Sequence, residues 1–171
     1  MEKFISIKEN VQTEIVVKKS KFICNLIKIE SQEEAEDYIR KIKKKYYDAR
    51  HNCVAYRVIE NEQVVEKSSD DGEPSGTAGG PMLNILQKNN LGNILVVVTR
   101  YFGGILLGTG GLVRAYSDAT LDAIDQGAVS LRVSQNVFGV VFALAFCVIF
   151  YWFMPKKKDR KSTRLNSSHR T

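Results

Sequence analysis

Alternating apolar and polar positions predict strands in two early parts of the chain. Residues 14–17 and 21–29 are rich in β-branched residues and are separated by the polar stretch 18–20. This pattern predicts a hairpin or a bulged strand pair. Residues 53–59 and 63–68 show a second pair of such segments around a polar turn. We therefore expect two strand pairs in the first 70 residues.

A helix is predicted between these two strand pairs. Ser31 and Glu34 form a capping-box pattern, which is typical of a helix N-terminus. The apolar residues that follow have the spacing of one helix face. These residues are Ala35, Tyr38, Ile39, Ile42 and Tyr46.

The second half of the chain predicts three further elements. Pro81 begins a short helix, since proline is tolerated at the first helical position. The unbroken apolar run 94–98 indicates a strand covered on both faces, and residues 112–126 form a helix that Gly127 ends. The order ββ-α-ββ-α-β-α predicts an α+β fold, with a sheet and helices packed on one face, in a domain spanning residues 1–128.

Charge divides the 171-residue chain into two unequal parts. The net charge is +6, but residues 1–131 carry 17 basic and 18 acidic residues, whereas residues 132–171 carry 8 and 1. The basic character therefore belongs to the tail, which argues against broad nucleic-acid binding by the domain. Three scattered cysteines and the absence of an apolar leader pattern favour the cytoplasm.

The tail permits two interpretations. Residues 137–154 form an uncharged apolar run followed by Lys156, Lys157 and Lys158, which is typical of a membrane anchor. Residues 161–171 have no periodicity and resemble translated adaptor sequence. We expect much of residues 129–171 to be a frameshift or assembly product, with a tail-anchored membrane protein as the alternative.

A glycine-rich loop between the buried strand and the last helix is the first candidate site. Backbone N–H groups of such a loop, together with a helix N-terminus, favour an anion, and the two arginines add charge. The alternative is that the glycines only allow close packing. The candidate phosphate- or nucleic-acid-binding residues are Arg100, Tyr101, Phe102, Gly103, Gly104, Gly108, Gly110, Gly111 and Arg114.

An acidic loop and the one histidine of residues 1–128 supply the secondary candidates. The carboxylates of the acidic loop suggest a Mg²⁺ ion held together with a phosphate. Their spacing instead favours a polar turn, so we expect no metal. The histidine suits acid–base catalysis or a phosphate contact, or merely a hydrogen bond at a sheet end. No catalytic motif accompanies them, and an enzyme is not favoured. These candidates are Arg50, His51, Asp70, Asp71, Glu73 and Ser75.

Three segments together resemble the IMPACT/YigZ family. They are Asp-Ala-Arg-His-Asn-Cys at 48–53, Asp-Asp-Gly-Glu-Pro-Ser-Gly-Thr-Ala-Gly at 70–79, and the Arg-Tyr-Phe-Gly-Gly loop within 99–116. The resemblance covers residues 14–128 and implies a two-layer fold similar to the second domain of ribosomal small-subunit protein five. It also implies a second, ferredoxin-like domain in bacterial members, whose pattern is missing after Ala128.

The family resemblance also implies a role linked to translation. Its eukaryotic members are translational regulators, so we expect a regulatory or binding module that contacts the ribosome, RNA or a translation-associated protein. We expect no cofactor and no DNA specificity. The alternatives are a small enzyme or binding protein for a phosphorylated ligand, and the tail-anchored membrane protein.

Overall fold

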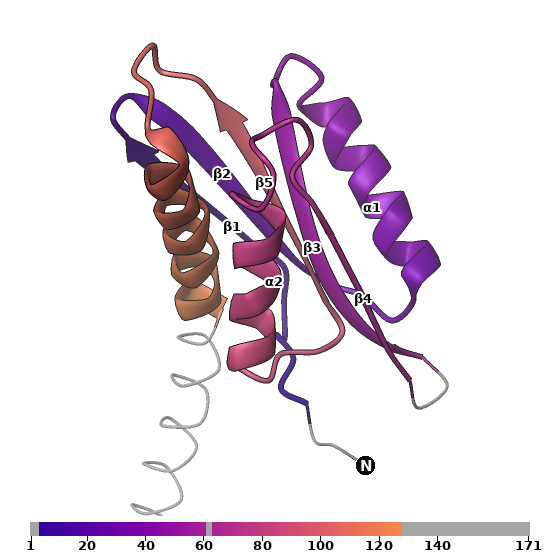
Figure 1. Ribbon diagram of the computed structural model, residues 1–171. Coiled ribbons are helices and arrows are strands. Elements are labelled where there is room, and N and C mark those ends of the chain that lie inside the picture. The colour runs from indigo at the N-terminus through magenta and orange to yellow at the C-terminus, as the bar shows by residue number, and fades with distance from the viewer. Residues whose placement is uncertain (1–3, 61–62, 128–171) are drawn as a thin grey trace, which may run out of the picture. The chain divides into compact units, whose positions relative to one another are not determined.

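The computed structural model describes residues 4–60 and 63–127, and its centre is a five-stranded sheet of order β1-β2-β5-β3-β4 (Figure 1). All neighbouring strands run antiparallel. The elements follow the predicted order: β1 (Val11–Val17), β2 (Ser20–Lys28), α1 (Gln32–Lys45), β3 (His51–Glu60), β4 (Gln63–Ser69), α2 (Gly79–Lys88), β5 (Ile94–Tyr101) and a helix over residues 108–127.

Strand β5 lies at the middle of the sheet although it is the last strand in the chain. It pairs with β2 on one side and with β3 on the other. Its side chains alternate between two separate apolar clusters, with Leu95 and Val97 in one and Ile94, Val96 and Val98 in the other. The predicted burial of this strand on both faces is therefore confirmed.

The helices cover both faces of the sheet, which differs from the single covered face that we expected. Helix α1 buries Ala35, Ile39 and Ile42 in one cluster, whereas α2 and the helix over residues 108–127 contribute Met82 and Tyr116 to the other. Figure 1 shows α1 across the sheet from those two helices. The physical reason is that a central strand with apolar side chains on both faces needs cover on both. The α+β class itself is confirmed.

Local sequence signals at two element ends act as predicted. The Ser31 hydroxyl accepts a hydrogen bond from the Glu34 N–H at 3.1 Å, and the Glu34 carboxylate accepts one from the Glu30 N–H at 2.8 Å. The hairpin between β1 and β2 turns through Lys18 and Lys19, whose φ angles are 47° and 65°. A two-residue turn with positive φ at both positions is type I′, which matches the twist of the strands.

No helix within the part of the chain that the structure describes is long and apolar enough to span a membrane. The apolar run 137–154, on which the membrane-anchor interpretation depends, lies outside the described residues.

Candidate functional site

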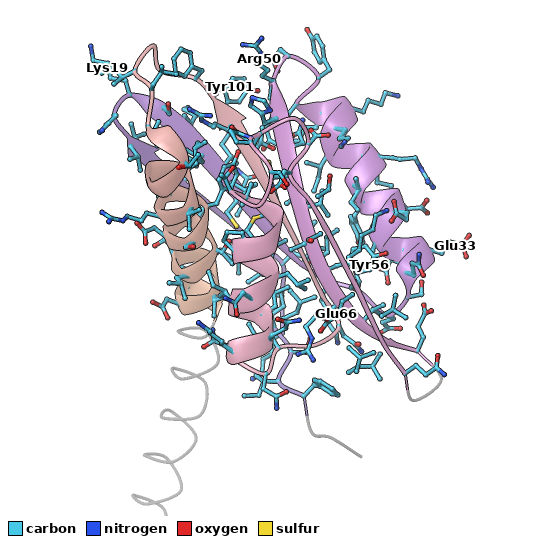
Figure 2. The ribbon with its side chains drawn as sticks, in the orientation of Figure 1. Lys19, Glu33, Arg50, Tyr56, Glu66 and Tyr101 are labelled. Carbon is cyan, nitrogen blue, oxygen red and sulfur yellow. The ribbon has the colours of Figure 1, made fainter. Side chains whose placement is uncertain are left out.

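Three segments that carry predicted site residues meet the β1–β2 turn at one end of the sheet, which we call the Lys19 end. The register pairs Val17 with Ser20, Lys21 with Tyr101, and His51 with Arg100. The β1–β2 turn, the end of β5 and the start of β3 therefore lie together, and the loop after β4 reaches them. Figure 2 shows the labelled Lys19, Tyr101 and Arg50 at this end, away from Glu33 and Glu66.

Arg100, the first candidate phosphate-binding residue, is paired inside the protein. Its Nη1 donates to Glu73 Oε1 at 2.6 Å, and the side chains of Arg100 and Glu73 are only 7% and 3% exposed. The Tyr116 hydroxyl donates to the same carboxylate oxygen at 2.9 Å. The positive charge of Arg100 is thus neutralised by an internal carboxylate rather than presented at the surface.

The aromatic neighbours of Arg100 are divided between the core and the surface. The Arg100 guanidinium carbon lies 5.6 Å from the ring centres of both Phe22, which is buried, and Phe102, which is 50% exposed. The Tyr101 hydroxyl donates to Asp48 at 2.8 Å. Desolvation, and next this contact with Asp48, raise the pKa of Tyr101 to about 12. Tyr101 therefore stays protonated near neutral pH, with its polar end already engaged.

Cys53 is buried beside this cluster. Its Sγ lies 2.9 Å from the carbonyl oxygen of Asp70 and 3.3 Å from the Tyr116 hydroxyl. Burial raises the pKa of the Cys53 thiol to about 12. Because the thiolate is the reactive form of cysteine, this residue packs as a neutral thiol near neutral pH.

Asp70 organises the acidic loop by accepting backbone hydrogen bonds. Its carboxylate receives the N–H groups of Gly76, Ala78 and Gly79 at 2.8, 3.0 and 2.8 Å. These groups lie at or just before the start of α2, where N–H donors lack partners within the helix. Burial acts to raise the pKa of Asp70, but the three backbone N–H groups outweigh it and hold this pKa below its usual value.

We expect Asp70→Asn to destabilise the protein at neutral pH and to weaken its acid sensitivity. An amide cannot replace both carboxylate oxygens as acceptors, so the free energy of unfolding should fall by about 1–2 kcal/mol. The lowered pKa means that Asp70 stabilises the fold above about pH 4 and loses that contribution as the pH falls through its folded-state pKa. Urea denaturation at pH 7, 4 and 3 measures both effects. Equal losses of stability on acidification in the two proteins would contradict the assignment.

The other secondary candidates are divided among separate structural contacts. Asp71 accepts hydrogen bonds from the Asn52 N–H at 2.7 Å and from Lys43 at 2.6 Å, and its carbonyl oxygen lies 2.9 Å from His51 Nδ1. Ser75 and Arg50 are exposed. Within residues 4–60 and 63–127, no three histidine, cysteine or acidic side chains are placed to hold a metal ion. The carboxylates of this loop instead satisfy donors of the protein itself.

The glycine-rich loop contains glycines with different structural roles. A Cβ at Gly103 would lie 2.0 Å from the carbonyl carbon of Lys19, and the Gly103 N–H donates to the Ser20 hydroxyl at 3.1 Å. Gly104 and Gly108 adopt positive φ angles of 86° and 73°. The close-packing interpretation therefore explains Gly103, which fixes the loop to the β1–β2 turn.

Gly108, Gly110 and Gly111 form the start of the last helix and border an open hollow of about 600 Å³. Val17, Leu107 and Ala115 supply apolar walls. The charged lining residues are Lys18, Arg114 and Asp118. The predicted loop and Arg114 thus do meet at one concave surface, whereas Arg100 is not among the residues that line it.

The structure adds residues that the sequence did not single out as functional. Lys18 and Lys19 are exposed at the turn, and the loop after β5 exposes Ile105 by 43% and Leu106 by 82%. The sequence shows only a polar break at residues 18–20, and the positive φ angles of the two lysines, in a type I′ turn normally made from Asn and Gly, are visible only in the structure.

Comparisons with known proteins identify relatives of this chain. Residues 18–124 match the family model of the Impact N-terminal domain. The IMPACT family member YvyE of Bacillus subtilis is 48% identical over 78% of this chain, and YigZ of Escherichia coli is 45% identical over 64%. A crystal structure described as that of a hypothetical protein matches with a TM-score of 0.69 and 42% identity, over 74% of this chain and 62% of the other. The matched regions span 61% of YvyE and 54% of YigZ.

Proposed function

Because the chain belongs to the IMPACT family, we propose that it is a translation-linked binding module that contacts the translation machinery through its Lys19 end. The family match agrees with the resemblance that the sequence motifs carried. The link to translation is the role that this resemblance implies. The finer statement, that the ribosome is bound through this surface, is our own.

The observation that carries the proposal is a group of exposed cations at the Lys19 end. Within the described residues, none of these four cations has an ion-pair partner. The four are Lys18, Lys19, Arg50 and Arg114. Unpaired cations gathered at one surface support association with an anionic partner. Because residues 1–131 sum to −1, the attraction is local to this end.

The proposal is tested by replacing Lys18 with Asn and Lys19 with Gly in the full chain. Asn-Gly is the preferred sequence of a type I′ turn, so the free energy of unfolding should rise by about 1 kcal/mol. The same change removes two positive charges, so affinity for purified bacterial ribosomes at low salt should fall about tenfold. Co-sedimentation and urea denaturation measure the two effects. A loss of binding in a more stable protein cannot come from misfolding.

A matched control removes the same charge elsewhere. Lys28 and Lys88 are exposed, and neither lies at the Lys19 end. The Lys28→Gln/Lys88→Gln variant should co-sediment with ribosomes as the unchanged protein does. Equal binding by all three proteins would reject the Lys19 end as the contact, and no binding by the unchanged protein would reject the ribosome as the partner.

A further inference from the structure

We propose that the Lys19 end binds an acidic protein segment that carries an apolar anchor residue, rather than RNA. This inference rests on the proposed function, since it names the chemistry of the partner at the same surface. Its elements are the loop 102–107, the hollow beside it and the cations at its rim.

The loop presents apolar side chains to solvent in a fixed position. Phe102, Ile105 and Leu106 are 50%, 43% and 82% exposed. Gly103 fixes the loop through its contact with the Lys19 backbone and its hydrogen bond to Ser20. Apolar side chains held at a surface in this way are typical of protein contacts, in which a few apolar residues carry most of the affinity.

The adjacent hollow is complementary in polarity and charge to a partner's apolar side chain flanked by carboxylates. Val17, Leu107 and Ala115 form its apolar walls, and its volume is about 600 Å³. Lys18 and Arg114 also line it, with Asp118 as the single acidic residue of the lining. A partner whose carboxylates meet Lys18 and Arg114, and whose apolar side chain enters between the walls, complements both properties.

Two observations argue against RNA as the occupant. Arg100, the residue best suited to hold a phosphate, is buried and has its guanidinium paired with Glu73. The region 1–131 has no net positive charge, whereas RNA binding depends on neutralising several phosphates. An acidic segment needs only the few cations that are present.

The test is direct binding of synthetic probes to the full chain, measured by fluorescence anisotropy. The first probe is a ten-residue peptide of Asp, Glu and Gly with one central Leu. The second replaces that Leu with Ser, and the third is a ten-nucleotide oligouridylate. We expect the Leu peptide to bind about tenfold more tightly than the Ser peptide, with binding that weakens as salt rises.

Variants of the protein locate the contact. Leu106→Ser should weaken binding of the Leu peptide about tenfold, and Arg114→Gln about fivefold. Two controls make the same kinds of change away from the Lys19 end. Val64→Ser replaces an exposed apolar residue on β4, and Lys88→Gln replaces an exposed basic residue on α2. Both should leave binding of the Leu peptide unchanged. Because Leu106 is 82% exposed, its replacement should not alter the melting temperature, which serves as the folding check.

The outcomes separate this inference from the proposed function. Absence of peptide binding, or equal binding by Leu106→Ser, overturns the inference even if ribosomes co-sediment with the chain. Tighter binding of the oligouridylate than of the Leu peptide overturns it in favour of RNA. Peptide binding that depends on Leu106 and Arg114 supports it, whether or not ribosomes are the source of the natural partner.

Discussion

Replacing Arg100 with methionine is expected to lower the free energy of unfolding by about 3–5 kcal/mol. The substitution leaves the carboxylate of Glu73, which is 3% exposed, without its cation. Tyr116 still donates to Glu73, but one neutral hydrogen bond does not compensate a buried negative charge. Urea denaturation at pH 7 measures the loss. The guanidinium also lies over Phe22, so part of the loss comes from packing in the core.

A second substitution in the same protein isolates the charge. Arg100→Met/Glu73→Gln removes both charges and keeps an acceptor for Tyr116, so it should recover most of the lost stability. Lys21→Met is the matched control, because Lys21 and Glu14 form an ion pair whose side chains are both 46% exposed. That control should change stability by less than about 1 kcal/mol. A double variant as unstable as Arg100→Met alone would show that packing, not charge, dominates.

The sequence predicts the burial of Arg100 only in part. Arg100 has the same parity in β5 as Ile94, Val96 and Val98, so the strand period sends its side chain to the same apolar face. An arginine at a strand end is nevertheless usually exposed, and only the tertiary fold shows that Glu73 reaches it from a loop 27 residues away. The strand pattern therefore predicts the face of the sheet on which the Arg100 side chain lies, whereas its partner Glu73 is identified only from the fold.

The fold elements were predictable because their signals are local. The capping residues Ser31 and Glu34 and the polar break at residues 18–20 lie within a few residues of the groups that they organise. The acidic loop is different, since Asp70 bonds N–H groups six to nine residues ahead of it. Its composition predicted a turn, but which carboxylate satisfies the start of α2 depends on the loop path.

The apolar run 94–98 by itself implies that helices lie on both faces of the sheet. A strand buried on both faces is incompatible with helices on a single face, and the run 94–98 predicted such a strand. The element order alone does not say on which side each connection crosses the sheet. The strand pattern was therefore the stronger guide to the layers.

Gly103→Ala is expected to be the most damaging alanine substitution in the glycine-rich loop, lowering the free energy of unfolding by about 3 kcal/mol or more. The new Cβ would lie 2.0 Å from the Lys19 carbonyl carbon and 2.4 Å from the Ser20 N. Both are backbone atoms, so neither a rotamer change nor a flexible side-chain end relieves the overlap. The loop must separate from the β1–β2 turn and lose the hydrogen bond to Ser20. Thermal and urea denaturation measure the loss.

Two neighbouring glycines give controls of different magnitude and sign. Gly104 has open space around it but a φ of 86°, so Gly104→Ala should cost about 1 kcal/mol through backbone strain alone. Gly110 has open space, ordinary φ and a helical position, so Gly110→Ala should stabilise the protein by up to about 1 kcal/mol. The three substitutions add the same methyl group to one sequence motif. Similar effects from all three would mean that Gly103 is not held against the turn, and that the loop is free to move away from Lys19.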